Sequence, residues 1–148
     1  MGDGSDGRAA TLLARMEGRW GIAREIEDHL TGEQSVFAGE AVFAWSGSGL
    51  AYCETGALRL PGRAPLRGER RYLWCDCGDA VGVFFDDGRP FHRFAPAGGS
   101  AEHWCAPDRY RVRYGFDALS AAPPAWDAAW TVVGPRKNYM MQSRYTRL

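Results

Sequence analysis

Two of the three histidines, His92 and His103, lie on either side of a Pro/Gly-rich break, and they are the side chains best suited to chemistry. An imidazole titrates near neutral pH, can bind a metal or a haem iron, and can act as a general acid or base. If residues 96–99 form a four-residue hairpin loop, the two imidazoles lie opposite each other on one face of the sheet. The spacing therefore predicts either a functional histidine pair or a hydrogen-bonded pair that supports the fold.

The same register makes further pairs across this hairpin. It places Arg93 opposite Glu102, as an ion pair, and Phe91 opposite Trp104, as an aromatic pair. A two-residue turn at Asp87-Gly88 extends the pattern to the preceding strand. One face then carries Val83, Phe85, His92, Phe94, His103 and Cys105, and the other carries Phe84, Phe91, Arg93, Glu102 and Trp104. We expect the first face to be internal, because an Arg–Glu pair is more stable in solvent. The row Phe84, Phe91 and Trp104 would then suit a homodimer interface.

Two charged residues are in phase with apolar neighbours. Arg24 alternates in step with Trp20 and Ile22, and Glu54 alternates in step with Tyr52. Since a buried charge needs a partner, the simplest interpretation is an internal Arg24–Glu54 ion pair. The alternative is that Arg24 binds the anionic head group of an internal ligand.

Near the C-terminus, two stretches carry further cations. In residues 109–116 the arginines alternate with Tyr110, Val112, Tyr114 and Phe116, which predicts a solvated face over an internal one and not a nucleic-acid strand. Arg136 and Lys137 follow the turn at Gly134-Pro135. They form either a solvated loop or a gate for an anionic ligand.

These side chains need a scaffold, and the hydrophobic pattern predicts it. Residues 9–18 are typical of a short helix, and after Gly18 the periodicity is two, in about ten short runs separated by turn residues. We therefore expect an all-β, antiparallel, up-and-down barrel, because an open sheet of that many strands would expose two long edges. Residues 1–10 are expected to be disordered and residues 11–148 to form one domain.

Composition restricts the possible functions. The 148 residues have a formal net charge of +0 at pH 7 and include 45% hydrophobic residues, so a dedicated nucleic-acid or membrane-surface protein is not expected. The start of the chain lacks a signal peptide and no stretch is long enough to span a membrane, which favours the cytoplasm. The four cysteines would then be reduced, and their spacing lacks the pattern of a zinc site, so no metal is expected.

Several motifs resemble known families. Gly18-Arg19-Trp20, after a short helix, resembles the Gly-x-Trp signature of lipocalins, in which an arginine of the last strand covers the tryptophan; Arg147 or Arg144 is placed to do so. The stretches DGRPFH, HWCAPDRYRVRY and GPRKNYMMQSRYTR resemble an uncharacterised bacterial family, a domain of unknown function. That resemblance implies a lipocalin-like, or calycin-like, barrel. Nitrobindin-type barrels, which hold haem through a histidine, are similar in size.

These observations predict a barrel that binds a small, partly apolar ligand in its lumen, and the internal and rim cations would suit an anionic one. The expected ligand-binding residues are Arg24, Tyr52, Glu54, His92, His103, Tyr114, Arg136 and Lys137. Three alternatives remain. The barrel could be an enzyme that uses His92 or His103 as base and Glu54 or Tyr52 as acid, a haem protein, or a dimeric module without a ligand.

Overall fold

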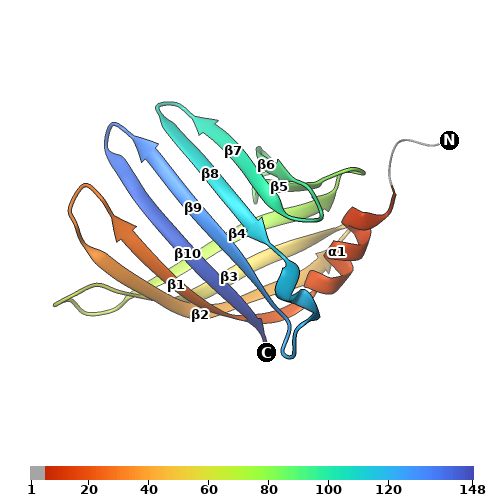
Figure 1. Cartoon of the computed structure of the whole chain (residues 1–148), viewed down its shortest axis with the longest axis horizontal. Coiled ribbons are helices and arrows are strands. Elements are labelled where there is room, and N and C mark those ends of the chain that lie inside the picture. Colours follow the sequence, from red (N-terminus) through yellow and green to blue (C-terminus); the bar gives the residue numbers. More distant parts are fainter. Residues whose placement is uncertain (1–5) are drawn as a thin grey trace.

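The computed structural model of the protein describes residues 6–148, which form one short helix, ten strands and a single turn of 3-10 helix (Figure 1). In chain order these are α1 (Arg8–Met16), β1 (Gly18–Asp28), β2 (Gln34–Ser46), β3 (Gly49–Arg59), β4 (Leu66–Asp76), β5 (Val81–Phe85), β6 (Pro90–Phe94), β7 (Gly99–Cys105), β8 (Asp108–Gly115), η1 (Asp117–Ser120), β9 (Ala125–Gly134) and β10 (Lys137–Arg147). The predicted all-β architecture is confirmed. The disorder expected for residues 1–10 lies outside the described residues at 1–5, and residues 8–10 instead form the start of α1.

The strands form one antiparallel sheet in the order β6-β5-β4-β3-β2-β1-β10-β9-β8-β7. The first and last strands are neighbours in the sheet: β1 pairs with β10 from Trp20–Arg147 to Asp28–Tyr139. The sheet curls into a nearly closed barrel whose only unpaired junction among the described strands lies between β6 and β7. Chain connectivity and strand order thus match an up-and-down barrel, with one open seam.

The helix closes one end of the barrel (Figure 1). Its buried face consists of Ala9, Leu12, Leu13 and Met16. The Trp20 indole donates a hydrogen bond to the Met16 carbonyl at 2.8 Å, and the Arg147 guanidinium lies 4.0 Å from the centre of the Trp20 ring. Arg147 also donates to the carbonyls of Arg15 and Glu17. The lipocalin-type contact is therefore made by Arg147 and not by Arg144.

Gly18 makes this contact possible. Its φ of 122° is one that residues with a side chain rarely adopt, and a Cβ at this position would collide with the Arg147 guanidinium. Arg144 instead pairs with Asp127 on the outer surface.

The interior next to the helix is filled by aromatic rings. Trp20, Phe43, Trp74 and Trp126 pack edge to face or tilted, with ring centres 4.9–6.2 Å apart. Such close packing of large rings stabilises the fold and fills this part of the interior. We refer to this part of the barrel as the closed end.

The strands from β5 to β7 also differ from their predicted register, beginning with the hairpin of β5 and β6. The predicted pair Val83–His92 forms, but a bulge at Val83/Phe84 shifts the ladder so that Phe84 faces Pro90. Phe91 consequently turns inward and is buried. The row Phe84, Phe91 and Trp104 therefore does not exist as an outer surface.

Beyond the bulge, β7 pairs with β8 and not with β6. Glu102 accordingly binds Arg111 at 2.6 Å, and Arg93 binds Asp79 at 3.3 Å. His92 and His103 are not partners across a ladder, so the predicted Arg93–Glu102 and His92–His103 pairs are wrong.

Within residues 6–148, no helix is long and apolar enough to cross a membrane.

Candidate functional site

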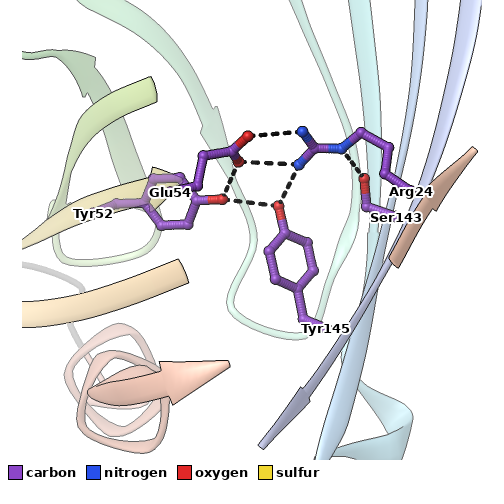
Figure 2. A network of polar contacts seen from close by, with 5 residues as sticks. All are labelled: Arg24, Tyr52, Glu54, Ser143 and Tyr145. Carbon is purple, nitrogen blue, oxygen red and sulfur yellow. Dashed lines mark hydrogen bonds and ion pairs between the residues drawn. The ribbon is translucent and has the colours of Figure 1, made fainter. Parts of the chain in front are cut away.

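A buried ion pair crosses the interior above the closed end (Figure 2). Arg24 of β1 donates from Nη1 to Glu54 Oε2 at 2.7 Å and from Nη2 to Glu54 Oε1 at 3.0 Å. Both side chains are almost fully buried, at 6% and 4% exposure. The internal Arg24–Glu54 pair predicted from the alternation is confirmed.

Three hydroxyl groups complete this arrangement, which we call the polar layer (Arg24, Tyr52, Glu54, Ser143 and Tyr145; Figure 2). Arg24 also donates to Ser143 at 2.7 Å and to Tyr145 at 3.1 Å. The Tyr52 hydroxyl donates to Glu54 at 2.5 Å, so the Tyr145 hydroxyl, 2.9 Å from it, must donate to Tyr52. The guanidinium is thus occupied by protein partners.

The polar layer keeps its charges. Burial acts to raise the Glu54 pKa, but the hydrogen bonds and charge of Arg24 outweigh it and hold the pKa below its ordinary value. Burial and the nearby Tyr145 and Glu54 raise the pKa of Tyr52 well above that of a free phenol. At neutral pH the layer is one cation, one anion and neutral phenols, so it carries no net charge.

Strand register explains why these residues meet. Arg24 lies opposite Ser143 on one neighbouring strand and opposite Phe37 on the other. The Phe37 ring supports the guanidinium at 5.0 Å, and it fits only because Gly56 and Gly68 lie beneath it. A Cβ on Gly56 would come within 2.7 Å of the Phe37 ring.

His92 belongs to a separate contact. Its Nε2 lies 2.9 Å from the Tyr114 hydroxyl, and its Nδ1 has no hydrogen-bond partner among the described residues. Burial, with a smaller contribution from the charge of His103, lowers the pKa of His92 to about 3. At neutral pH the ring is therefore uncharged, and it is too weak a base for efficient proton transfer.

A cavity of about 710 Å³ opens at the end of the barrel remote from the helix; we call it the mouth cavity. Aromatic side chains, aliphatic carbons and two arginines form its wall. It is lined by Arg70, Tyr72, Phe85, Arg89, Pro90, Phe91, His103, Trp104, Cys105, Tyr110, Trp130, Val132, Tyr139 and Met141. The lining contains no aspartate or glutamate. Of the eight predicted ligand-binding residues, only His103 is among these.

The predicted rim residues do not reach this cavity directly. Lys137 donates to the Tyr110 hydroxyl at 3.1 Å and pairs with Asp108 at 3.2 Å, while Arg136 is exposed in the turn. These contacts raise the pKa of Lys137, which therefore stays charged. Lys137 thus lies outside the mouth cavity and contacts its wall only through Tyr110.

The model of a family of unknown function, DUF6314, matches residues 16–147. The chain belongs to this family. No curated protein matches the sequence of this DUF6314 member.

A similar fold occurs in the S-type phycobiliprotein lyase CPES from Guillardia theta. The TM-score is 0.62 at 7% sequence identity, over 93% of the DUF6314 chain and 89% of the lyase chain. At that identity the likeness concerns the fold alone.

The principal mouth residues of this DUF6314 barrel were not singled out from sequence. Arg70, Tyr72 and Trp74 are in phase along β4, and Trp126 and Trp130 are in phase along β9. That signal was present, but alternation indicates only which face is internal. It does not show which internal residues lie at the filled end and which lie at the open one.

No group of three or more histidine, cysteine, aspartate or glutamate residues within 6–148 is arranged to hold a metal ion. All four cysteines are free, and Cys105, at the mouth, is exposed.

Proposed function

We propose that this protein binds a small, partly apolar molecule with an anionic group, and that the binding site is the mouth cavity. The observation that carries the proposal is the composition of its wall: aromatic rings with two arginines and no carboxylate. Binding sites for small molecules are usually apolar cavities of this size with a few polar groups that fix orientation.

The aromatic part of the wall is organised around Phe91. This ring stacks on Phe85 at 4.6 Å and on Trp130 at 5.3 Å, and the His103 ring meets it edge-on at 5.1 Å. A stack of this kind is rigid, so it offers apolar area to a ligand at little conformational cost. It suits a molecule with an extended apolar body.

The charged part favours an anion. Arg70 is exposed and has no ion pair among residues 6–148, whereas Arg89 pairs only with the exposed Asp87. The polar layer below is electrically neutral, and Arg70 has no anionic partner in the described part of the chain that would compete with a ligand. An arginine fork binds carboxylate, sulfonate or phosphate groups in bidentate geometry.

The fold supports the same use of the interior. A phycobiliprotein lyase has this fold, which is consistent with a barrel that handles a small molecule. Arg24, Tyr52, Glu54 and Tyr114 then act as the floor beneath the ligand and not as its head-group site, because their polar atoms already bind one another or His92.

The fluorescent anion anilinonaphthalene sulfonate is a direct test. We expect it to bind the wild-type protein with enhanced emission, and we expect Arg70→Gln to weaken binding about tenfold through loss of a charge-assisted contact. Arg71→Gln is the matched control, since Arg71 is adjacent on β4 but faces outward and pairs with Glu69. Equal affinity in the two variants would reject the mouth cavity as an anion site. Native mass spectrometry of freshly purified protein would identify any molecule that remains bound.

Haem is the second candidate, because His103 is the one histidine that lines the mouth cavity and it lies there with Arg70 and Arg89. Titration with haem distinguishes it. A Soret band that is lost in His103→Ala would assign the cavity to haem, and a titration with no histidine-dependent band excludes it. An acid–base pair of His92 and His103 has no comparable support, because the two rings do not pair and the pKa of His92 is about 3.

A further inference from the structure

A second, much smaller cavity lies next to the mouth cavity; we call it the deep pocket. Its volume is about 40 Å³, enough for one water molecule or one polar ligand group. Arg70, Tyr72, Phe91 and Trp130 line both cavities, so the two cavities are adjacent. The deep pocket therefore extends the mouth cavity toward the centre of the barrel.

Two buried nitrogen atoms without partners belong to side chains that line the deep pocket. They are Nδ1 of His92 and Nε1 of Trp126, on residues that are 7% and 1% exposed. Within residues 6–148 these are the only fully buried side-chain polar atoms that lack a hydrogen bond. A buried polar group without a partner is costly, so two such groups on residues that line one small pocket point to an occupant.

The chemistry of the two atoms defines that occupant. The indole Nε1 can only donate. The buried Tyr114 phenol needs an acceptor for its proton, and His92 Nε2 is its hydrogen-bond partner, so we assign the phenol proton to this bond and the imidazole proton to Nδ1. Both atoms are then donors, and the pocket requires an acceptor.

We propose that the deep pocket is a subsite for a neutral acceptor oxygen, a ketone or amide carbonyl, at the inner end of the ligand. The proposal rests on the proposed function, because the anionic end of the same ligand would lie at Arg70 and Arg89. A carbonyl oxygen has two lone pairs and can accept from both donors. The ligand class is thus an apolar molecule with an anion at one end and a carbonyl group at the other.

A second anion is disfavoured in the deep pocket. The Glu54 carboxylate lines it, and its charge is already balanced by Arg24. The imidazole is uncharged and supplies no compensating positive charge. The one cation in the lining is Arg70, which the proposed function assigns to the anionic end of the ligand, so a second carboxylate would compete for the same charge, whereas a carbonyl needs only the two hydrogen bonds.

The test compares two series of probes by displacement of anilinonaphthalene sulfonate. One series is the alkanoates from hexanoate to dodecanoate, and the other is the same acids with a ketone on the penultimate carbon. At the best chain length we expect the keto acid to bind wild-type protein about tenfold more tightly than the plain acid, from two hydrogen bonds to one acceptor. His92→Leu and Trp126→Phe should each reduce the preference to about threefold or less while plain acids still bind.

A spectroscopic measurement on the wild-type protein makes the test independent of the folding of those variants. The indole N–H resonance of Trp126 should shift downfield with the keto acid and not with the plain acid. The Trp20 indole, which already binds the Met16 carbonyl, is the internal control and should not move.

The outcomes separate the two proposals. Binding of neither series would refute the proposed function itself. Equal affinity for both series with an unmoved Trp126 resonance would overturn the deep subsite and leave the anion site standing. A preference for the keto acid that survives in His92→Leu and in Trp126→Phe would overturn it as well.

Discussion

The two ends of this barrel are built from the same strands but serve different purposes, and β4 shows the difference within three inward-facing residues. Trp74 is buried at the closed end, Tyr72 is half-buried above it, and Arg70 is exposed at the mouth. The strand pattern is unchanged along this series. Only the size and polarity of the inward residues change, from a ring that fills space to a charge that needs water or a ligand. Stability and ligand binding are thus separated along the barrel axis.

The polar layer divides the two ends, and breaking it should have the largest effect. Glu54→Gln would leave Arg24 buried without a counter-charge, and we expect the free energy of unfolding to fall by about 3–5 kcal/mol. Urea denaturation measures it. The control is Glu102→Gln, which removes an exposed pair with Arg111 and should cost less than about 1 kcal/mol. Similar losses in both variants would show that the buried pair has no special role.

The next prediction compares two tryptophans at opposite ends. Trp20→Ala would open a cavity in the closed end and should cost about 3–5 kcal/mol, whereas Trp130→Ala should cost about 1–2 kcal/mol because Trp130 is only partly buried. Binding should show the opposite order. Loss of Trp130 should weaken anilinonaphthalene sulfonate strongly, while Trp20→Ala should change its affinity little under conditions where it is folded. A ligand effect of Trp20→Ala as large as that of Trp130→Ala would contradict the separation of the two ends.

The sequence was sufficient for the fold and for the floor of the site. Alternation placed Trp20, Arg24 and Glu54 inside, and the turn residues separated ten strands correctly. These features are local, or they follow from the need to pair a buried charge. They hold whichever way the barrel curls.

The predictions that were wrong depended on contacts between strands that are distant in the sequence. Turn residues predict that β5 pairs with β6 and β6 with β7, but a bulge at Val83/Phe84 between β5 and β6 turns Phe91 inward. Strand β7 pairs with β8 instead, where Glu102 binds Arg111. The mouth was missed for a similar reason. Nothing in the sequence distinguishes Arg70 from the other arginines of the strands. Only the three-dimensional arrangement shows that it borders the mouth cavity while Arg71 faces solvent.

The buried, uncharged His92 should make the free energy of unfolding depend on pH. Burial depresses its pKa to about 3 in the folded state, from 6.5 for an unperturbed histidine. Between these values the unfolded chain binds a proton that the native state does not, so stability falls as the pH falls from 6.5 toward 3. From about pH 7 to about pH 5 the wild type should lose about 2 kcal/mol more than His92→Leu. Parallel losses in the two proteins would mean that His92 is hydrated or charged in the native state.

The smallest predicted effect concerns the contact of Arg147 with Trp20 at the closed end. Because the sequence left Arg147 and Arg144 as alternatives for this contact, the two arginines are compared. Arg147→Ala removes the cation over Trp20 and the hydrogen bonds to the helix carbonyls, and we expect a loss of about 1–2 kcal/mol. Arg144, on the same strand as Arg147, makes an exposed pair with Asp127 of β9, and Arg144→Ala should cost less than about 1 kcal/mol. Both are measured by urea denaturation. A larger loss of stability in Arg144→Ala would mean that the Arg147–Trp20 contact contributes less than the exposed Arg144–Asp127 pair. The packed rings alone would then account for the stability of the closed end. Neither variant should alter ligand affinity, because both arginines lie outside the mouth cavity.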